Sequence, residues 1–144
     1  MMNVSCDIAV NIPKKPLNFK IVLNGYTIFD ERTTLSAYKL NHEFIPNDNN
    51  ILEFYIDGKS NEHTEFKDDV MIDSACIELS NIKLNDIDVT NMALSNDDLI
   101  TYTHDCNGHD DMKVNVFDSL LGFNGVVVLE FSTPLDEWVS NNTF

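Results

Sequence analysis

The sequence predicts an all-β protein, an antiparallel two-sheet sandwich of jelly-roll-like form with at most short helical turns. Val and Ile together supply 23 of the 144 residues and Ala only four, a balance that favours strands over helices. Asn and Asp supply 34 residues, and four of the five glycines directly follow one of them, as in tight hairpin turns. Between these turns, apolar and polar side chains alternate.

Four segments show this alternation most clearly. In each segment, an apolar residue at every second position makes one face of a strand that can pack on a core. These inward-facing sets are Phe19, Ile21 and Leu23; Leu52, Phe54 and Ile56; Ala75, Ile77 and Leu79; and Val127, Leu129 and Phe131. Each strand therefore has one face for a core and one face for solvent or a ligand.

The other elements are shorter. Further strands are expected near residues 6–12, 38–45, 82–89, 99–104 and 113–117. Helix is expected only around residues 34–40 and in the final turn at 134–138, where Pro134 suits the first helical position. Eight or nine short strands with regular turn signals indicate two packed sheets in one domain that spans residues 1–144.

The charge of the chain excludes two classes of partner. There are 24 acidic and nine basic side chains, so the formal net charge is −15. Nucleic acid is not an expected partner, because its phosphates are normally met by clustered Lys and Arg. A membrane is not expected either, because anionic lipid repels such a chain and no apolar run approaches the roughly 20 residues that span a bilayer.

The cysteines indicate a reducing compartment. Cys6, Cys76 and Cys106 are odd in number and show no C-x-x-C spacing, so we expect reduced thiols. The first residues contain no basic region followed by an apolar stretch, so no secretory signal is expected. Together these features predict a protein that is assembled in a cytosol.

An acidic cluster is the candidate metal site. Asp68, Asp69 and Asp73, with Glu62 and Glu65 just before them, offer the hard oxygen ligands that calcium takes at the edge of a β-sandwich. The alternative is a solvated acidic loop in a chain that is already strongly acidic, and this reading is favoured because charge runs usually face solvent. No cofactor is therefore expected, and calcium is the candidate if this cluster does bind a metal ion.

A second cluster invites a zinc site. His104, Cys106 and His109 lie within six residues and are ligand types that a tetrahedral zinc ion accepts. The alternative, a plain hairpin turn around Asn107 and Gly108, is favoured because short motifs of this kind often arise by chance.

Catalysis has little support in the sequence. It contains no nucleophile elbow, no glycine-rich phosphate loop and no H-E-x-x-H motif, so we expect a protein that is not an enzyme. Exposed aromatic side chains are candidates for sugar binding or for an interface instead. The candidates are Tyr26, Tyr38, Tyr55, Tyr102 and Trp138, of which Trp138 is expected to dock the C-terminal tail onto the body.

Two longer stretches, residues 50–87 and 122–138, carry a resemblance. Their motifs are the turn Asp57-Gly58-Lys59, a Thr-containing loop at Thr64, and the series Gly122-x-Asn124-Gly125, Phe131-x-x-Pro134 and Trp138. In these features the chain resembles small, mostly uncharacterised β-sandwich virion proteins of tailed bacteriophages of marine hosts, including cyanophages. The first stretch also resembles calcium-dependent carbohydrate-binding modules with a jelly-roll sandwich, in which a strand, an Asp-bearing loop and a long strand follow in that order.

The resemblance to phage proteins implies a structural or accessory subunit of a virion. Such a subunit would decorate the capsid or associate with the tail, bind capsid or tail proteins or further copies of itself, and be assembled in the host cytoplasm. The resemblance to carbohydrate-binding modules implies an alternative, a calcium-assisted module that recognises a glycan on the host surface.

Overall fold

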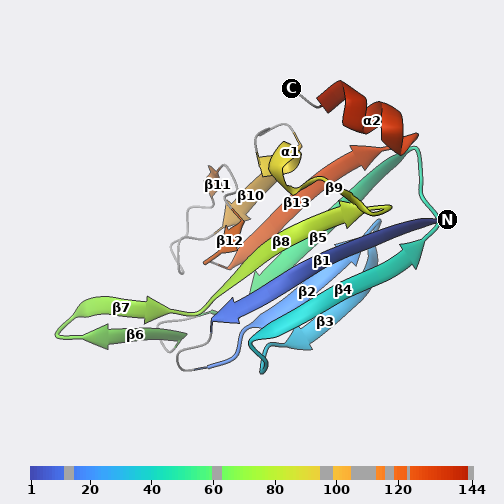
Figure 1. Ribbon diagram of the computed structural model, residues 1–144. Helices are drawn as coiled ribbons and strands as arrows, with labels where there is room; N and C mark the ends of the chain where they lie inside the picture. The colour runs from blue at the N-terminus through green and yellow to red at the C-terminus, as the bar shows by residue number, and fades with distance from the viewer. Residues whose placement is uncertain are drawn as a thin grey trace.

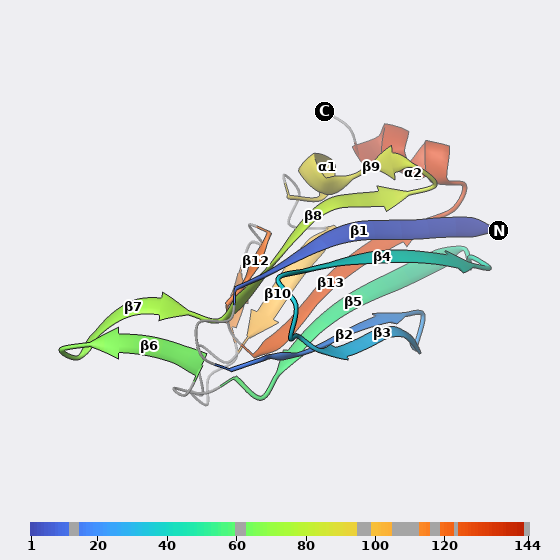
Figure 2. The ribbon, with the colours of Figure 1, turned by 60° about the horizontal axis from the view of Figure 1, so that its bottom comes forward.

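The computed structural model describes residues 1–11, 15–59, 63–94, 99–104, 113–115, 119–122 and 124–142. Two antiparallel sheets pack face to face, and a two-stranded hairpin projects from one end of them (Figures 1 and 2). The prediction of an all-β, two-sheet sandwich is therefore confirmed.

The first sheet, which we call sheet A, has the strand order β12-β8-β1-β4, and β9 pairs with β8. Its strands are β1 (Met2–Asn11), β4 (Ala37–Phe44), β8 (Cys76–Leu84), β9 (Ile87–Asp88) and β12 (Leu120–Leu121). Along β1 every second side chain from Met2 to Val10 is buried, as the two-residue period of a strand requires.

The second sheet, sheet B, has the strand order β11-β10-β13-β5-β2-β3. Its strands are β2 (Asn18–Leu23), β3 (Tyr26–Arg32), β5 (Asn49–Asp57), β10 (Ile100–His104), β11 (Lys113–Asn115) and β13 (Gly125–Ser132). Residues distant in the sequence meet at its centre, where Leu52 of β5 lies opposite Leu129 of β13 and both are fully buried.

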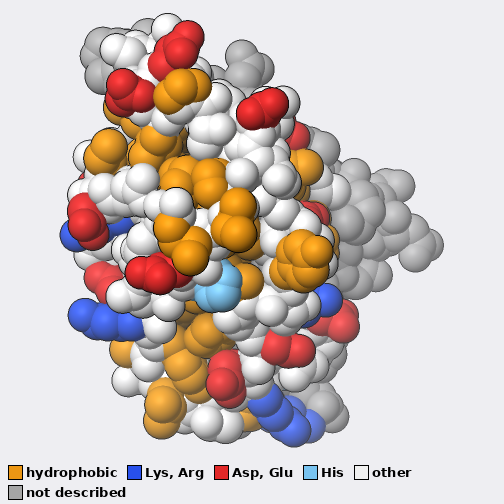
Figure 3. Space-filling model, turned by 90° about the vertical axis from the view of Figure 1, so that its right-hand side faces the viewer, with side chains coloured by type: hydrophobic (Ala, Val, Ile, Leu, Met, Phe, Trp, Pro, Cys, Tyr) orange, Lys and Arg blue, Asp and Glu red, His pale blue; other side chains and the backbone are white. Residues whose placement is uncertain are grey.

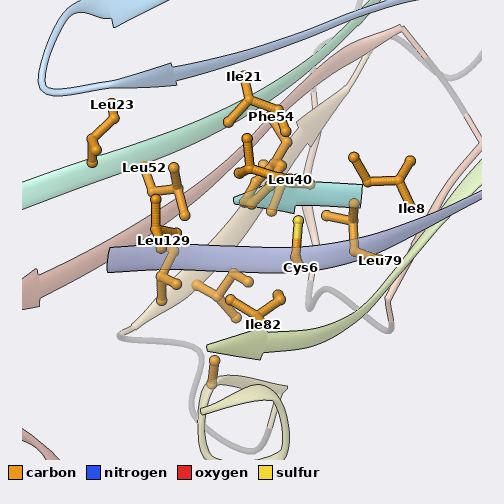
Figure 4. Close-up of a cluster of buried hydrophobic side chains, with 14 of the residues drawn as sticks. Cys6, Ile8, Ile21, Leu23, Leu40, Leu52, Phe54, Leu79, Ile82 and Leu129 are labelled. Carbon is orange, nitrogen blue, oxygen red and sulfur yellow. The ribbon is translucent and has the colours of Figure 1, made fainter. Parts of the chain in front are cut away.

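The core lies between the sheets. The inward-facing side chains of both sheets form one cluster (Figure 4). Members that Figure 4 labels are Cys6, Ile8, Leu40, Leu79 and Ile82 from sheet A, and Ile21, Leu23, Leu52, Phe54 and Leu129 from sheet B. Burial, and secondarily the charge of Asp7, raise the pKa of the Cys6 thiol to about 12, so this thiol stays protonated and behaves as a small apolar side chain.

Two short helices complete the described part of the chain, α1 (Thr90–Leu94) and α2 (Leu135–Asn142). The helical turn expected at 134–138 is found as α2, which starts one residue later and continues to Asn142. As predicted, Trp138 docks the tail, because it is buried with its ring centroid 6.1 Å from that of Phe131. Neither helix has the length and apolar character that a membrane-spanning helix needs, a statement that covers the described residues alone.

The helix expected around residues 34–40 is a wrong prediction. From Ala37 onward this segment is strand β4, which confirms the overlapping strand expected at 38–45 and pairs with β1 in the register Ala9 opposite Ala37 to Met2 opposite Phe44. Leu40 and Phe44 face the core at strand spacing, and this burial outweighs the local helix signal. Strand β3, helix α1 and the projecting hairpin have no counterpart in the predicted elements.

The predicted break between two strands at residues 79–82 is also wrong. The sequence predicts one strand up to Leu79 and another from Ile82, whereas the structure has a single strand with a bulge between them. Asn81 takes a left-handed φ of 48° there, and the buried positions change from Ile77 and Leu79 to Ile82 and Leu84. One extra residue in a strand shifts its inward face by one position, so the bulge keeps the whole strand on the core.

Candidate functional site

The outer face of sheet B contains an open groove of about 660 Å³. Four strands build it, because β3, β2, β5 and β13 lie side by side and their outward side chains line up across the sheet. Its lining residues are Asn18, Phe19, Lys20, Asp30, Tyr55, Ile56, Asp57, Asn124, Gly125 and Val126. The volume falls within the range of ordinary small-ligand sites.

Tyr55 occupies the middle of the groove. On β5 it lies directly opposite Lys20 of β2 and Val126 of β13. The Lys20 ammonium lies over the Tyr55 ring, 5.0 Å from its centroid, which is a cation–π contact. The Tyr55 hydroxyl donates a 2.6 Å hydrogen bond to Oε2 of Glu53, two residues earlier on the same face. The ring is thus held at its face and at its hydroxyl.

This geometry also sets the ionisation of Tyr55. The hydrogen bond to Glu53 raises the pKa of the hydroxyl to about 12, with smaller contributions from burial and from the negative charge of Glu53. The phenol is therefore neutral at physiological pH and acts as a hydrogen-bond donor to the carboxylate. Nothing in this arrangement activates Tyr55 as an acid or base near neutral pH.

Polar side chains surround the aromatic ring. Asp30 lies opposite Lys20 on the β3 side, and Asn18 lies opposite Asp57 at one end of the groove. The Asp57 carboxylate accepts a 2.9 Å hydrogen bond from the backbone N–H of Gly58. The charged lining side chains are two carboxylates and one ammonium, so the groove combines a single aromatic surface with hydrogen-bonding groups and a small negative charge.

Asn124 joins two strand ends beside the groove. Its amide oxygen accepts a 2.7 Å hydrogen bond from the backbone N–H of Lys59, and its amide nitrogen donates a 2.8 Å bond to the carbonyl of Lys59. The Lys59 ammonium, in turn, is buried and donates to the carbonyl of Gly122. The Asp57-Gly58-Lys59 and Gly122-x-Asn124-Gly125 motifs therefore meet in space and fix the ends of β5 and β13.

The predicted calcium residues lie elsewhere, in the projecting hairpin that we call the arm, which consists of β6 (Thr64–Lys67), a two-residue turn and β7 (Val70–Ser74). Asp68 and Asp69 form the turn, with left-handed φ values of 53° and 65°. Asp73 lies four residues beyond Asp69 along β7, about 13 Å at the rise of a strand. There it accepts a 2.8 Å hydrogen bond from the side chain of Asn11.

The three carboxylates are therefore not brought together as a ligand set. Glu62 lies outside the described residues, and Glu65 lies opposite Asp73 across the hairpin. Within the described ranges, no group of three or more His, Cys, Asp or Glu side chains is placed to hold a metal ion. The turn separates the carboxylates because a tight hairpin turn points its residues away from the strands that follow.

The predicted zinc cluster falls mostly outside the described residues, which exclude 105–112. Only His104 is described. It is buried on β10, and its ring lies 4.7 Å from the ring of Tyr102, centroid to centroid.

The five aromatic side chains expected to be exposed differ in burial and in position. Tyr102 and Trp138 are buried, and Tyr38 packs partly against the core while its hydroxyl accepts hydrogen bonds from the N–H groups of Thr34 and Leu35. Tyr26 is 78% exposed at the start of β3, outside the groove. Tyr55 is the candidate that lines the groove on sheet B. The sequence places Tyr55 and Lys20 on the outward faces of their strands. It does not predict that β2 pairs with β5, and this pairing is what brings the two side chains together.

Comparison of the chain with protein-family models, with curated proteins and with solved structures finds no match. The resemblances to phage virion proteins and to carbohydrate-binding modules therefore stay predictions.

Proposed function

We propose that this protein is an accessory structural subunit of a tailed-phage virion, a capsid decoration or tail-associated protein that binds other virion proteins. The observation that carries this proposal is the arm, which projects well beyond both sheets (Figures 1 and 2). A two-stranded hairpin gains little stability alone in water, so a projecting one is best explained by a partner that covers it.

The arm has the features of an attachment element. Its tip exposes two large apolar side chains, Phe66 at 49% and Val70 at 63%. Among the described strands, β6 and β7 pair with each other and form a separate two-stranded sheet, whose outer edges are sites for strand addition. The base of the arm is anchored, because the Asn11 side chain donates a hydrogen bond to Asp73 and Nε2 of His63 lies 3.0 Å from the Pro16 carbonyl oxygen.

A second apolar surface lies at the opposite end of the sandwich. Figure 3 shows hydrophobic side chains gathered there, with acidic side chains around them. Three residues at the strand ends on this side are about four-fifths exposed, namely Met1 at 83%, Tyr26 at 78% and Ile45 at 81%. Exposed apolar groups at both ends of a strongly acidic molecule support assembly with other proteins rather than a free monomer.

Particles of the phage that encodes the chain provide the test. Mass spectrometry of purified particles should detect the protein, and its absence from them contradicts the proposal. A Phe66→Ser, Val70→Ser double variant should fold with an unchanged melting temperature, because both side chains are exposed, yet it should be depleted from particles. Leu35→Ser is the matched control, since Leu35 is 59% exposed but outside the arm. Equal incorporation of all three proteins would exclude the arm as the attachment element.

A second candidate function, recognition of a glycan on the host surface, is favoured by one observation, the groove around Tyr55 on the outer face of sheet B. An aromatic ring flanked by amides and carboxylates is the kind of surface on which a ligand is both stacked and hydrogen-bonded. A glycan array in the presence of calcium, repeated with a chelator, tests this function. Binding to any glycan supports it, loss of binding with chelator adds calcium to it, and no binding in either condition rejects it.

A further inference from the structure

The groove on sheet B contains a restrained aromatic platform with polar groups on both sides of it. Tyr55 is fixed by Lys20 over its ring and by Glu53 at its hydroxyl. A side chain that is already held in place loses little conformational entropy when a ligand stacks on it. The platform therefore has the character of a preformed binding surface, in contrast to Tyr26, which is far more exposed and lies outside the groove.

The lining groups define what the platform could accept. At one end, Asn18 and Asp57 lie opposite each other across β2 and β5, and Asp30 lies across β3 beside Lys20. Amides donate and accept hydrogen bonds, and carboxylates accept them. Hydroxyl groups do both, so a ligand rich in hydroxyls pairs with all of these side chains without bringing a charge of its own.

Charge argues against an acidic ligand. The groove itself holds two carboxylates against one ammonium, and the whole chain has a formal net charge of −15. A sulfated or carboxylated polymer would meet repulsion both at the site and at long range. The Lys20 ammonium contacts the Tyr55 ring, and its single positive charge does not offset the two carboxylates of the groove.

The size of the groove fits a short oligomer. Its volume is about 660 Å³, and it extends over four neighbouring strands. Strands in a sheet lie about 4.8 Å apart, so the four strands span roughly 14 Å across the sheet, long enough for more than one sugar ring.

We propose that this groove binds a neutral oligosaccharide, with the Tyr55 ring and the Lys20 side chain that lies over it as the contact surface and with Asn18, Asp30 and Asp57 as the hydrogen-bonding groups. The inference rests on the second candidate function, which already names the groove, and adds to it the contact residues, the class of sugar and independence from calcium. None of Asp68, Asp69 and Asp73 lines the groove.

Titration calorimetry with defined sugars tests the proposal on the full chain. The neutral probes are cellohexaose, xylohexaose and maltohexaose, and the acidic probe is an oligogalacturonate of similar length. At least one neutral probe should bind, the acidic probe should bind more weakly, and a chelator should change neither result. Tyr55→Ala should weaken binding roughly tenfold or more, a loss of about 1.4 kcal/mol per factor of ten.

Two further variants make the outcome specific. Tyr26→Ala removes an exposed tyrosine outside the groove and should leave affinity unchanged, while Asp57→Asn tests the polar end of the site and should weaken binding. If glycans bind on the array but Tyr55→Ala has no effect, or the acidic probe binds best, the inference is overturned and the second candidate function stands. If no glycan binds at all, both fail together.

Discussion

Tyr55 illustrates how one residue acquires its properties from its neighbours. Alternation along residues 52–56 already places it on the outward face, and that prediction is confirmed. Its contacts with Lys20 and Glu53 have different origins. Glu53 is two residues away and on the same face by strand geometry, whereas Lys20 is 35 positions earlier and meets Tyr55 only through the β2–β5 register.

The titration of Tyr55 can be tested directly. Glu53→Gln removes the carboxylate that accepts the hydroxyl proton, so the pKa of Tyr55 should fall from about 12 toward the ordinary 10.0. The folded pKa is raised, so the stabilisation from this hydrogen bond is present below about pH 10 and is lost as pH rises through about 12. Ultraviolet titration of the tyrosines, with Tyr55→Phe to assign the signal, measures this. An unchanged late-titrating tyrosine in Glu53→Gln would refute the assignment.

Among the four glycines that the structure describes, Gly125 has the least space for a side chain. A Cβ at this position would overlap the carbonyl oxygen of Thr103 and lie 2.7 Å from the Cα of His104. Gly125→Ala should therefore lower the free energy of unfolding by roughly 1–3 kcal/mol, measured by urea denaturation. Gly122→Ala is the control, since a Cβ there meets no atom within 4 Å and should cost much less. Equal losses in the two variants would show that crowding between β10 and β13 is not the cause.

At the scale of elements, the two-residue period predicts strands well where burial is one-sided. Strands β2, β5 and β13 bury the residues that alternation selects. The same rule fails to show β3, whose residues are mostly exposed because it is an edge strand with little core contact. It also misses the arm, whose two strands pair with each other and belong to neither of the two packed sheets.

The bulge in β8 makes a prediction about strand structure. Asn81 has a left-handed φ, and its side-chain amide donates a 2.7 Å hydrogen bond to Asp7 of β1. Asn81→Ala should destabilise the fold by about 1–2 kcal/mol, because a residue with a Cβ and no local hydrogen bond disfavours this conformation. Asn81→Gly leaves the left-handed φ easily accessible, so it should lower the stability less than Asn81→Ala when both variants are measured by thermal denaturation. The interpretation fails if Gly costs as much as Ala.

At the scale of the whole molecule, the charge distribution bears on stability as well as on partners. Lys39 and Asp7 form a surface ion pair at 3.9 Å, and exposed pairs of this kind contribute little to stability. With 24 acidic and nine basic side chains, the formal net charge is −15. Any protein partner of this chain must therefore meet it with apolar or basic groups.

Ionic strength provides the test of this self-repulsion. The urea midpoint should rise when sodium chloride is raised from low to physiological concentration and beyond, because at about 0.1 M salt the repulsion between exposed carboxylates more than about 10 Å apart is largely screened. An equimolar series with an uncharged osmolyte that is not a sugar, such as glycerol, controls for solvent effects other than screening. A midpoint that stays constant or falls with salt would show that repulsion does not limit stability.

The sequence by itself determined the class of the fold and the inward face of the main strands, because burial on one side of a pleated strand selects every second residue. It also placed the C-terminal helix after Pro134 and the docking of Trp138. Tertiary structure alone decided the order of strands in each sheet, the choice of strand over helix at residues 38–40, where the two expectations overlapped, and the position of the arm. It also decided that Lys20, Tyr55 and Asp57 share one groove while Asp68 and Asp73 lie apart. The physical reason is that strand pairing joins residues far apart in the chain, and local patterns specify which face is buried but not which strand lies beside it.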